Sequence, residues 1–166
     1  MEINVVQNTK EINCDLLVIN KFEDENTSDE LVNKYAVEED KFEGKFNNTY
    51  LLPTYGEKPA RKILVIGFGK KSNFNPNKLR EAIAKSVKKA VSIEAKTVCF
   101  VLEGVDFDYS EQLTMGIMIG DYTFDKYKSE KKDNHINKVY IQAYEENVRK
   151  AEKIATAMAF ARNLAN

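Results

Sequence analysis

The stretch RKILVIGFGKKSNFNPNKLREAIAKSV, residues 61–87, decides the fold of this chain. It begins with a short run of mostly β-branched apolar residues, Ile63 to Ile66, which predicts a buried strand. After two glycines and two lysines, Asn75 and Pro76 provide the N-cap and the first residue of a predicted helix. The apolar positions of that helix share one face: Leu79, Ile83, Val87, Ala90 and Val91. The stretch is therefore typical of a strand, loop and helix unit of an α/β sheet.

A second strand completes this unit. The run TVCFVLEG, residues 97–104, follows the helix at the distance that a parallel β-α-β crossover requires. Other short apolar runs predict further strands at residues 3–6, 15–20, 48–56 and 137–144. Because only residues 7–14 separate the first two of these, we expect them to be neighbouring strands joined by a tight connection.

Three further segments predict helices. The acidic, polar residues 23–48 predict a short surface helix flanked by loops, and residues 147–166 predict a last helix. Residues 110–127 are apolar on two sides, which indicates a largely buried helix. Gly116 and Gly120 lie four residues apart in it, so they share one stripe and allow close approach of another element.

Composition predicts a single domain over residues 1–166, because 43% of the residues are hydrophobic, enough for a core of ordinary size. The 25 basic and 26 acidic residues give a net charge of −1, so no strong field attracts nucleic acid. The chain shows neither a secretion signal nor an apolar run that could span a membrane, which predicts no membrane partner and a cytoplasmic location. Cys14 and Cys99 lie in apolar runs and are predicted to be buried, unreactive thiols.

The loop between the strand and the helix poses the first functional question. Gly67, Gly69 and Lys70 lie where a phosphate cradle would be, since glycine N–H groups and a helix N-terminus attract anions. The motif is incomplete, because a dinucleotide fingerprint needs a third glycine at the helix start and a P-loop needs Gly-Lys-Ser/Thr there. These three residues remain a candidate anion loop, and a plain turn is the favoured interpretation.

Patterns for catalysis and metal binding are weak. His135 is the single histidine and has no cysteine or histidine at ligand spacing, so we predict an exposed loop histidine and no metal site. The acidic run EDENTSDE, residues 23–30, lacks the spaced ligands and central glycine of a calcium loop and is predicted to be solvated. The chain also lacks the Gly-x-Ser-x-Gly elbow motif on which a serine triad would be built. The chain alone is predicted to carry no catalytic residue and no cofactor.

Several phrases taken together resemble the N-terminal domain of the leucyl aminopeptidase (cytosol aminopeptidase) family. In chain order they are CDLLVIN (14–20), FEGKFNNTYLLPTYG (42–56), RKILVIGFGK (61–70), KLREAIAKSVKKA (78–90), MGIMIGDYTFDKYKS (115–129) and AMAFARNLAN (157–166). The resemblance implies a three-layer α/β/α sandwich around a mixed, mostly parallel sheet, similar to a macro domain. It also implies a non-catalytic domain that supports hexamer assembly and shapes access to the active sites.

The resemblance further implies what this domain works with. The metal ligands and catalytic residues of the family belong to a C-terminal domain, so none of them is carried over to this chain. That domain is the implied partner; it holds two divalent metal ions, zinc or manganese, and removes N-terminal residues from peptides. Residues 147–166 are predicted to begin the linker helix that leads to it, with the chain ending at a domain boundary.

A macro-type module that binds a nucleotide, ADP-ribose, is the alternative. Asp15 and Asn20 occupy the places of the aspartate that opens, and the asparagine that ends, the corresponding strand of macro domains. Lys21, Phe22 and Glu23 then bring bulk and negative charge where those domains carry small and polar residues, and negative charge repels a diphosphate. The sequence favours the aminopeptidase domain and leaves the nucleotide-binding alternative open.

Overall fold

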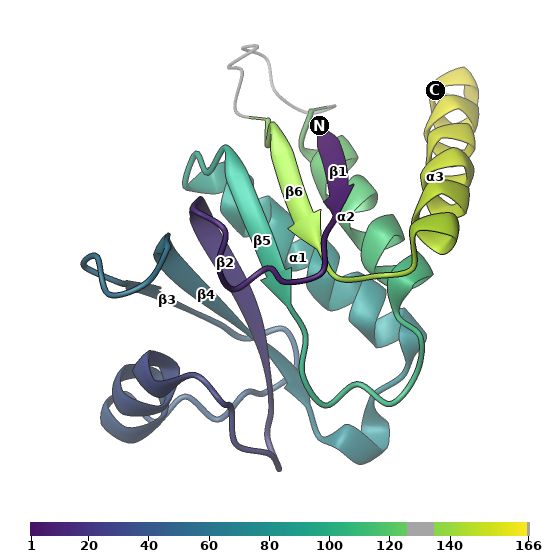
Figure 1. The fold of residues 1–166 in the computed structure, drawn as a ribbon. Coiled ribbons are helices and arrows are strands. Elements are labelled where there is room, and N and C mark those ends of the chain that lie inside the picture. Colours follow the sequence, from purple (N-terminus) through teal and green to yellow (C-terminus); the bar gives the residue numbers. More distant parts are fainter. Residues whose placement is uncertain (126–134, 166) are drawn as a thin grey trace.

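The computed structural model describes residues 1–125 and 135–165, and within them six strands form one sheet (Figure 1). The order across the sheet is β1-β6-β5-β2-β4-β3. Neighbouring strands are parallel except for β3 and β4, which are antiparallel, so the predicted mixed, mostly parallel sheet is confirmed. The strands are β1 (Glu2–Val5), β2 (Cys14–Phe22), β3 (Thr49–Pro53), β4 (Ala60–Gly69), β5 (Thr97–Val101) and β6 (Lys138–Ile141).

Helices cover both faces of this sheet, as the predicted three-layer α/β/α sandwich requires. Helices α1 (Pro76–Ser92) and α2 (Ser110–Asp125) lie behind the sheet in Figure 1, and α3 (Glu145–Ala165) packs beside α2. The short π-helix η1 (Val32–Glu39) lies on the opposite side, at the lower left of Figure 1, and a 3₁₀ turn, η2 (Lys71–Asn73), precedes α1. We call the side covered by α1 and α2 the back face and the side covered by η1 the front face.

The strand, loop and helix unit forms as the sequence predicts. The Asn75 side chain accepts a hydrogen bond from the Lys78 N–H (2.9 Å) and so caps α1. The predicted apolar face of this helix, including Leu79, Ile83 and Val87, is fully buried against the sheet. Strands β4 and β5 are parallel, with β2 between them.

The first two strands are not neighbours, so the predicted tight connection between them is wrong. Strand β1 pairs with β6, whereas β2 pairs with β4 and β5. Residues 6–13 instead pass across the front face, where Thr9 Oγ1 donates a hydrogen bond to the Phe100 carbonyl oxygen of β5 (3.1 Å). A link of this length can extend over about 26 Å, and three strand spacings take only about 14 Å, so it passes two intervening strands easily.

Two glycines let α2 pack closely on α1, as their spacing predicts. A Cβ atom on Gly116 would lie 2.8 Å from the Arg80 carbonyl oxygen. A Cβ atom on Gly120 would lie 2.7 Å from the Ala84 carbonyl oxygen. Any larger residue at these positions must therefore push the two helices apart.

The predicted helix boundaries agree with the observed ones to within a few residues. The predicted helix 110–127 is observed through Asp125, and its last two residues lie outside the described part of the chain. The predicted helix 147–166 corresponds to α3, and Asn166 also lies outside the described residues. The surface helix predicted within residues 23–48 is η1.

Strand β2 contributes to two separate cores. Leu16 and Val18 point to the back face and belong to the large apolar cluster with α1 and α2. Leu17 and Ile19 point to the front face and belong to a smaller cluster that includes Val32 of η1. This alternation is that of a strand buried on both sides.

Candidate functional site

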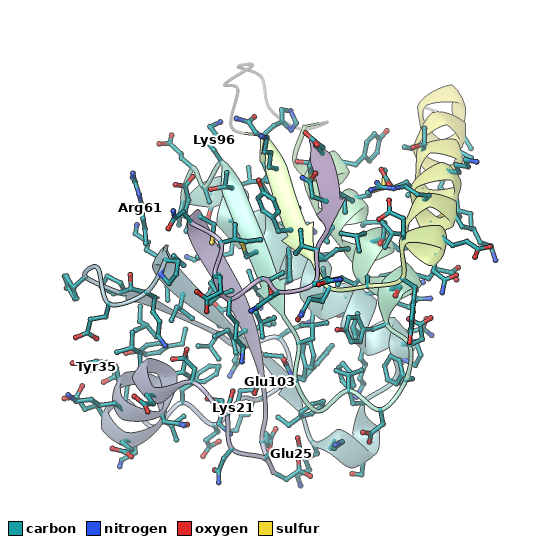
Figure 2. All side chains as sticks on the ribbon, in the orientation of Figure 1. Lys21, Glu25, Tyr35, Arg61, Lys96 and Glu103 are labelled. Atoms are coloured by element: carbon teal, nitrogen blue, oxygen red, sulfur yellow. The ribbon has the colours of Figure 1, made fainter. Side chains whose placement is uncertain are left out.

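Open parallel sheets bind ligands beyond the carboxyl ends of their strands, so that end is the first candidate for a site. Figure 2 shows Lys21, Glu25 and Glu103 at this end, whereas Arg61 and Lys96 lie at the opposite end of the sheet. The three side chains come from β2, the loop after β2 and the loop after β5. Charges of both signs therefore meet where a ligand of this fold would bind.

Gly67 and Gly69 of the candidate anion loop are the last residues of strand β4, so the favoured interpretation of a plain turn is wrong for them, and their N–H groups are engaged. Gly67 donates its N–H to the Asn48 carbonyl oxygen (2.8 Å), and Gly69 donates to the Gly44 carbonyl oxygen (2.9 Å). A Cβ atom on Gly67 would lie 2.0 Å from the Lys45 carbonyl oxygen, so close backbone approach requires this glycine. The geometry supports a structural role, since an anion would have to displace these hydrogen bonds.

The charges around the loop also differ from those of a phosphate cradle. Lys70 is exposed, and the Lys71 ammonium pairs with Glu25 (Nζ to Oε1, 2.7 Å) and with Asp106 (Nζ to Oδ2, 3.4 Å). The Lys71 N–H donates to Asp24 Oδ1 (3.1 Å). The hydrogen bond that the Lys71 ammonium donates to Glu25 raises the pKa of Lys71. Carboxylates of the protein thus occupy donors that a diphosphate would need.

Lys21 is a buried lysine whose burial the sequence analysis missed. Its side chain donates from Nζ to the carbonyl oxygens of Phe22 and Glu25, both at 2.8 Å, and the residue is only 6% exposed. Burial lowers the pKa of Lys21, because desolvation disfavours the charged ammonium. Alternation along the strand would have indicated this, since Lys21 follows Leu17 and Ile19 on the front face.

The two residues that match the macro-domain strand both join β2 to β5. Asp15 Oδ2 accepts hydrogen bonds from the N–H groups of Lys96 (2.8 Å) and Thr97 (3.2 Å). The Asn20 amide donates to the Glu103 carbonyl oxygen and accepts from the Glu103 N–H, both at 2.8 Å. Asn20 is only 3% exposed. These contacts make both side chains braces of the sheet and do not favour a nucleotide site.

A cavity of about 440 Å³ opens on the front face, and we call it the front cavity. Its apolar floor consists of Cys14, Leu17 and Ile19 from β2 and Val101 from β5. Its walls come from three irregular segments, within residues 9–12, 28–30 and 58–60. An apolar floor with a few polar groups at the rim is the usual composition of a small-molecule site.

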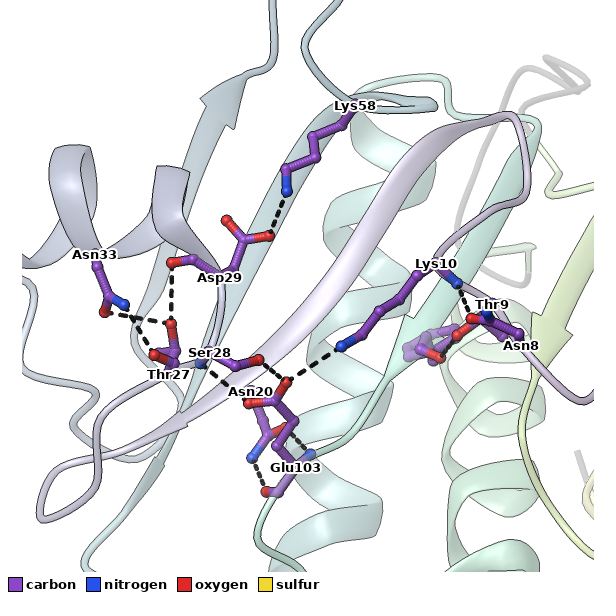
Figure 3. Close-up of polar contacts among 11 residues, drawn as sticks. Asn8, Thr9, Lys10, Asn20, Thr27, Ser28, Asp29, Asn33, Lys58 and Glu103 are labelled. Atoms are coloured by element: carbon purple, nitrogen blue, oxygen red, sulfur yellow. Dashed lines mark hydrogen bonds and ion pairs between the residues drawn. The ribbon is translucent and has the colours of Figure 1, made fainter.

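Two ion pairs lie at the rim of the front cavity, on either side of β2 (Figure 3). Lys10 Nζ is 3.9 Å from Glu103 Oε1, and Lys58 Nζ is 3.5 Å from Asp29 Oδ2. Both distances exceed the 2.7–2.9 Å or so of a tight charge-assisted hydrogen bond. The two pairs are therefore loose.

Donors of Ser28 and Val32 hold the two carboxylates of these pairs in place. Glu103 Oε2 accepts from the Ser28 N–H (3.3 Å), and Glu103 Oε1 accepts from the Ser28 hydroxyl. Asp29 Oδ1 accepts from the Val32 N–H (3.0 Å) at the start of η1. The prediction that residues 23–30 are solvated is wrong for Asp29, whose side chain is 13% exposed because it supports this helix and pairs with Lys58.

The two cysteines are buried free thiols, as predicted. A hydrogen bond between them lowers the pKa of Cys14 and raises that of Cys99, which burial raises further. Cys14 borders the front cavity, whereas Cys99 is fully buried. Cys14 is therefore the thiol that a reagent in the cavity would reach first.

A second hollow, of about 240 Å³, lies between α2 and α3 beside Met1. Met118 of α2 and Met158 of α3 form part of its apolar lining. His135 also lines it, and its Nδ1 is 3.3 Å from Asp121 Oδ1. The predicted exposed loop histidine is thus half-buried and paired with a carboxylate.

The described ranges, 1–125 and 135–165, contain neither a cluster of metal ligands nor a helix suited to a membrane. No group of three or more His, Cys, Asp or Glu side chains in these ranges is arranged to hold a metal ion. No helix within them combines the length and the apolar character that crossing a bilayer needs.

Residues 18–131 match the sequence model of a family described as "Cytosol aminopeptidase family, N-terminal domain". The chain belongs to this family. The match begins within β2 and extends beyond the end of α2, so it includes most of the sheet, the end of β4 with Gly67 and Gly69, and much of the front cavity. It confirms the resemblance found in the sequence.

Curated relatives in the cytosol aminopeptidase family are much longer than this chain. A probable cytosol aminopeptidase of Alkaliphilus oremlandii is 27% identical over 192 residues, covering 100% of this chain and 38% of the relative. One of Aquifex aeolicus is 33% identical over 139 residues, covering 80% of this chain and 28% of the relative. The chain therefore spans about a third of the length of such relatives.

Solved structures show the same fold. A mutant of tomato leucine aminopeptidase matches with a TM-score of 0.80 at 19% identity, covering 100% of this chain and 38% of the other. The bottromycin maturation enzyme BotP in complex with Mn matches with a TM-score of 0.70 at 19% identity, covering 92% of this chain and 32% of the other. At this identity the likeness establishes the fold alone.

Proposed function

We propose that this chain is the non-catalytic N-terminal domain of a metal-dependent leucyl aminopeptidase of the cytoplasm. The supporting observation is the match of residues 18–131 to the family's N-terminal domain, in relatives about three times as long. In this proposal, catalysis belongs to a C-terminal domain that holds two divalent ions, zinc or manganese, and removes N-terminal residues from peptides.

The proposed roles of this domain are hexamer assembly and the shaping of access to the active sites. Helix α3, which contains residues 147–165 of the predicted linker, carries exposed apolar side chains. Ile154 is 37% and Met158 42% exposed, and Met1 beside the second hollow is 44% exposed. Large apolar side chains gathered at a surface favour contact with another protein surface. These residues support a contact of α3 with the C-terminal domain.

The absence of catalysis in this chain can be tested directly. The purified 166-residue chain should not hydrolyse leucyl-p-nitroanilide with added Mn²⁺ or Zn²⁺, because it is proposed to lack the catalytic domain. Hydrolysis that increases with the amount of bound metal would contradict the proposal.

The role in assembly can be tested with a chimera in which this chain replaces the matching part of the Aquifex aeolicus relative. We expect the chimera to hydrolyse the same substrate and to sediment as a hexamer. The double substitution Ile154→Asp and Met158→Asp should weaken assembly, because it places charge in the proposed contact. Lys150→Asp, on an exposed position of the same helix, is the matched control. Unchanged sedimentation of the double variant would mean that this face of α3 does not contribute to hexamer assembly.

A further inference from the structure

We propose that the front cavity binds a small zwitterion with an apolar side chain, of the class of free apolar amino acids and dipeptides. The lining of the cavity alone supports this ligand, and binding it would go beyond the role proposed for the domain. Under that role, this ligand class would be the product and the shortest substrate of the parent enzyme.

The floor of the cavity favours a ligand with an apolar side chain. Leu17, Ile19 and Val101 present aliphatic side chains into a space of about 440 Å³ that lies within the usual size of small-molecule sites. A ligand side chain on this floor removes apolar surface from water, at about 25 cal/mol per Å². A purely ionic ligand gains nothing from such a floor.

The rim sets the charges of the ligand. The charged side chains that line the cavity are two lysines and four carboxylates: Lys10, Lys58, Glu11, Asp29, Glu30 and Glu103. The excess of carboxylates attracts an ammonium group and disfavours phosphates and other simple anions. Lys10 and Lys58, in turn, provide partners for one carboxylate of the ligand. Charges of both signs at one rim complement a zwitterion.

The two sides of each rim pair differ in how firmly they are held. Glu103 and Asp29 are fixed by Ser28 and by the first turn of η1. Their side chains are 32% and 13% exposed, compared with 59% for Lys10 and 34% for Lys58. The carboxylates are therefore preorganised acceptors, and the lysines can turn from their loose pairs towards a ligand carboxylate.

Calorimetric titration of the 166-residue chain tests the charge requirement. L-Leucine and the dipeptide Leu-Leu are the zwitterionic probes; L-leucinamide lacks the carboxylate, and 4-methylpentanoate lacks the amine. We expect at least one zwitterion to bind with a Kd below about 10 mM, and each singly charged probe to bind at least about tenfold more weakly. Whichever zwitterion binds more tightly shows whether the cavity prefers a free amino acid or a dipeptide. Equal binding of leucinamide and leucine, or no binding of either zwitterion, would overturn the proposal.

Two further measurements locate the site. Glu103→Gln keeps the size of the side chain and should weaken binding at least about tenfold, whereas Glu43→Gln, in an exposed ion pair elsewhere, should leave it unchanged. In the unaltered chain, the bound zwitterion should slow alkylation of Cys14 by iodoacetamide, because Cys14 lies in the floor. This second readout does not depend on the folding of a variant. Binding without protection of Cys14 would place the ligand elsewhere and contradict the proposal.

Discussion

On the back face of the sheet, α1 and α2 bury a continuous apolar core, whereas on the front face η1 and three loops leave a cavity of about 440 Å³ above the same strands. The contrast is sharpest in β2, where Leu16 is fully buried behind the sheet and Leu17 borders the cavity in front. One strand thus supports a dry, close-packed layer and an open, partly polar one.

The difference follows from what covers each face. Regular helices present a continuous apolar stripe, and the glycines of α2 bring them to close contact. Loops carry polar backbone groups that must remain hydrogen-bonded, so they cannot pack as densely on an apolar surface. On the front face, the side chains of Asp29 and Glu103 accept hydrogen bonds from such backbone N–H groups and so hold the loops above the floor of the cavity.

The largest expected effect is a difference between neighbouring residues of β2. Leu16→Ala should lower the free energy of unfolding by about 4 kcal/mol, because it creates a void in the packed back core. Leu17→Ala should lower it by about 2 kcal/mol, because it only enlarges an existing cavity. Urea unfolding of both variants provides the measurement. Equal losses would show that the two faces are packed alike.

Gly120→Ala tests the close contact of the back face. The added Cβ atom would lie 2.7 Å from Val87 Cβ as well as from the Ala84 carbonyl oxygen. We expect a loss of about 2 kcal/mol, although alanine improves helix propensity by about 1 kcal/mol. Gly56→Ala is the matched control: nothing lies within 4 Å, and its φ of +83° predicts a loss of about 1 kcal/mol from backbone strain alone. A Gly120 variant as stable as the original would mean that the helices can separate without cost.

The same contrast explains how much the sequence could predict. The back face depends on local patterns: a continuous apolar strand, a capped helix with a 3.6-residue period, and two glycines four residues apart. Each of these is specified within a few neighbouring residues, and the structure confirms all of them. The family resemblance rests on six segments that occur in the same order as in the family, and no single local pattern contains that order.

The front face depends on contacts between distant residues, and these left no local signal. Ser28 and Glu103 are 75 residues apart, and the crossing of residues 6–13 is fixed by a bond from Thr9 to Phe100, 91 residues away. Polar residues in loops are compatible with many pairings, so neither the cavity nor the separation of β1 from β2 could be read from them. Lys21 is the exception, because strand alternation already placed it on a buried face.

The smallest expected effect concerns the edge of the front face. Tyr50 of β3 donates a hydrogen bond from its hydroxyl to Asp40, and this bond raises the pKa of Tyr50 to about 12. The pKa in the unfolded chain is about 10, so the stabilisation is complete below about pH 10 and is lost as the pH rises from about 10 to 12.

Tyr50→Phe removes this contribution. Because the contact lies at the solvent-exposed surface, we expect a loss of only about 0.5–1 kcal/mol at pH 7, well below what the pKa shift alone would give. The difference between the two proteins should shrink as the pH rises above about 10, measured by urea unfolding between pH 7 and 11. Ser86→Ala on the back face, which removes a buried hydrogen bond to the Ala82 carbonyl oxygen, should give a difference that does not change with pH. A Tyr50 effect equally constant with pH would show that the hydroxyl does not depend on Asp40, and that the edge of the front face is held by packing alone.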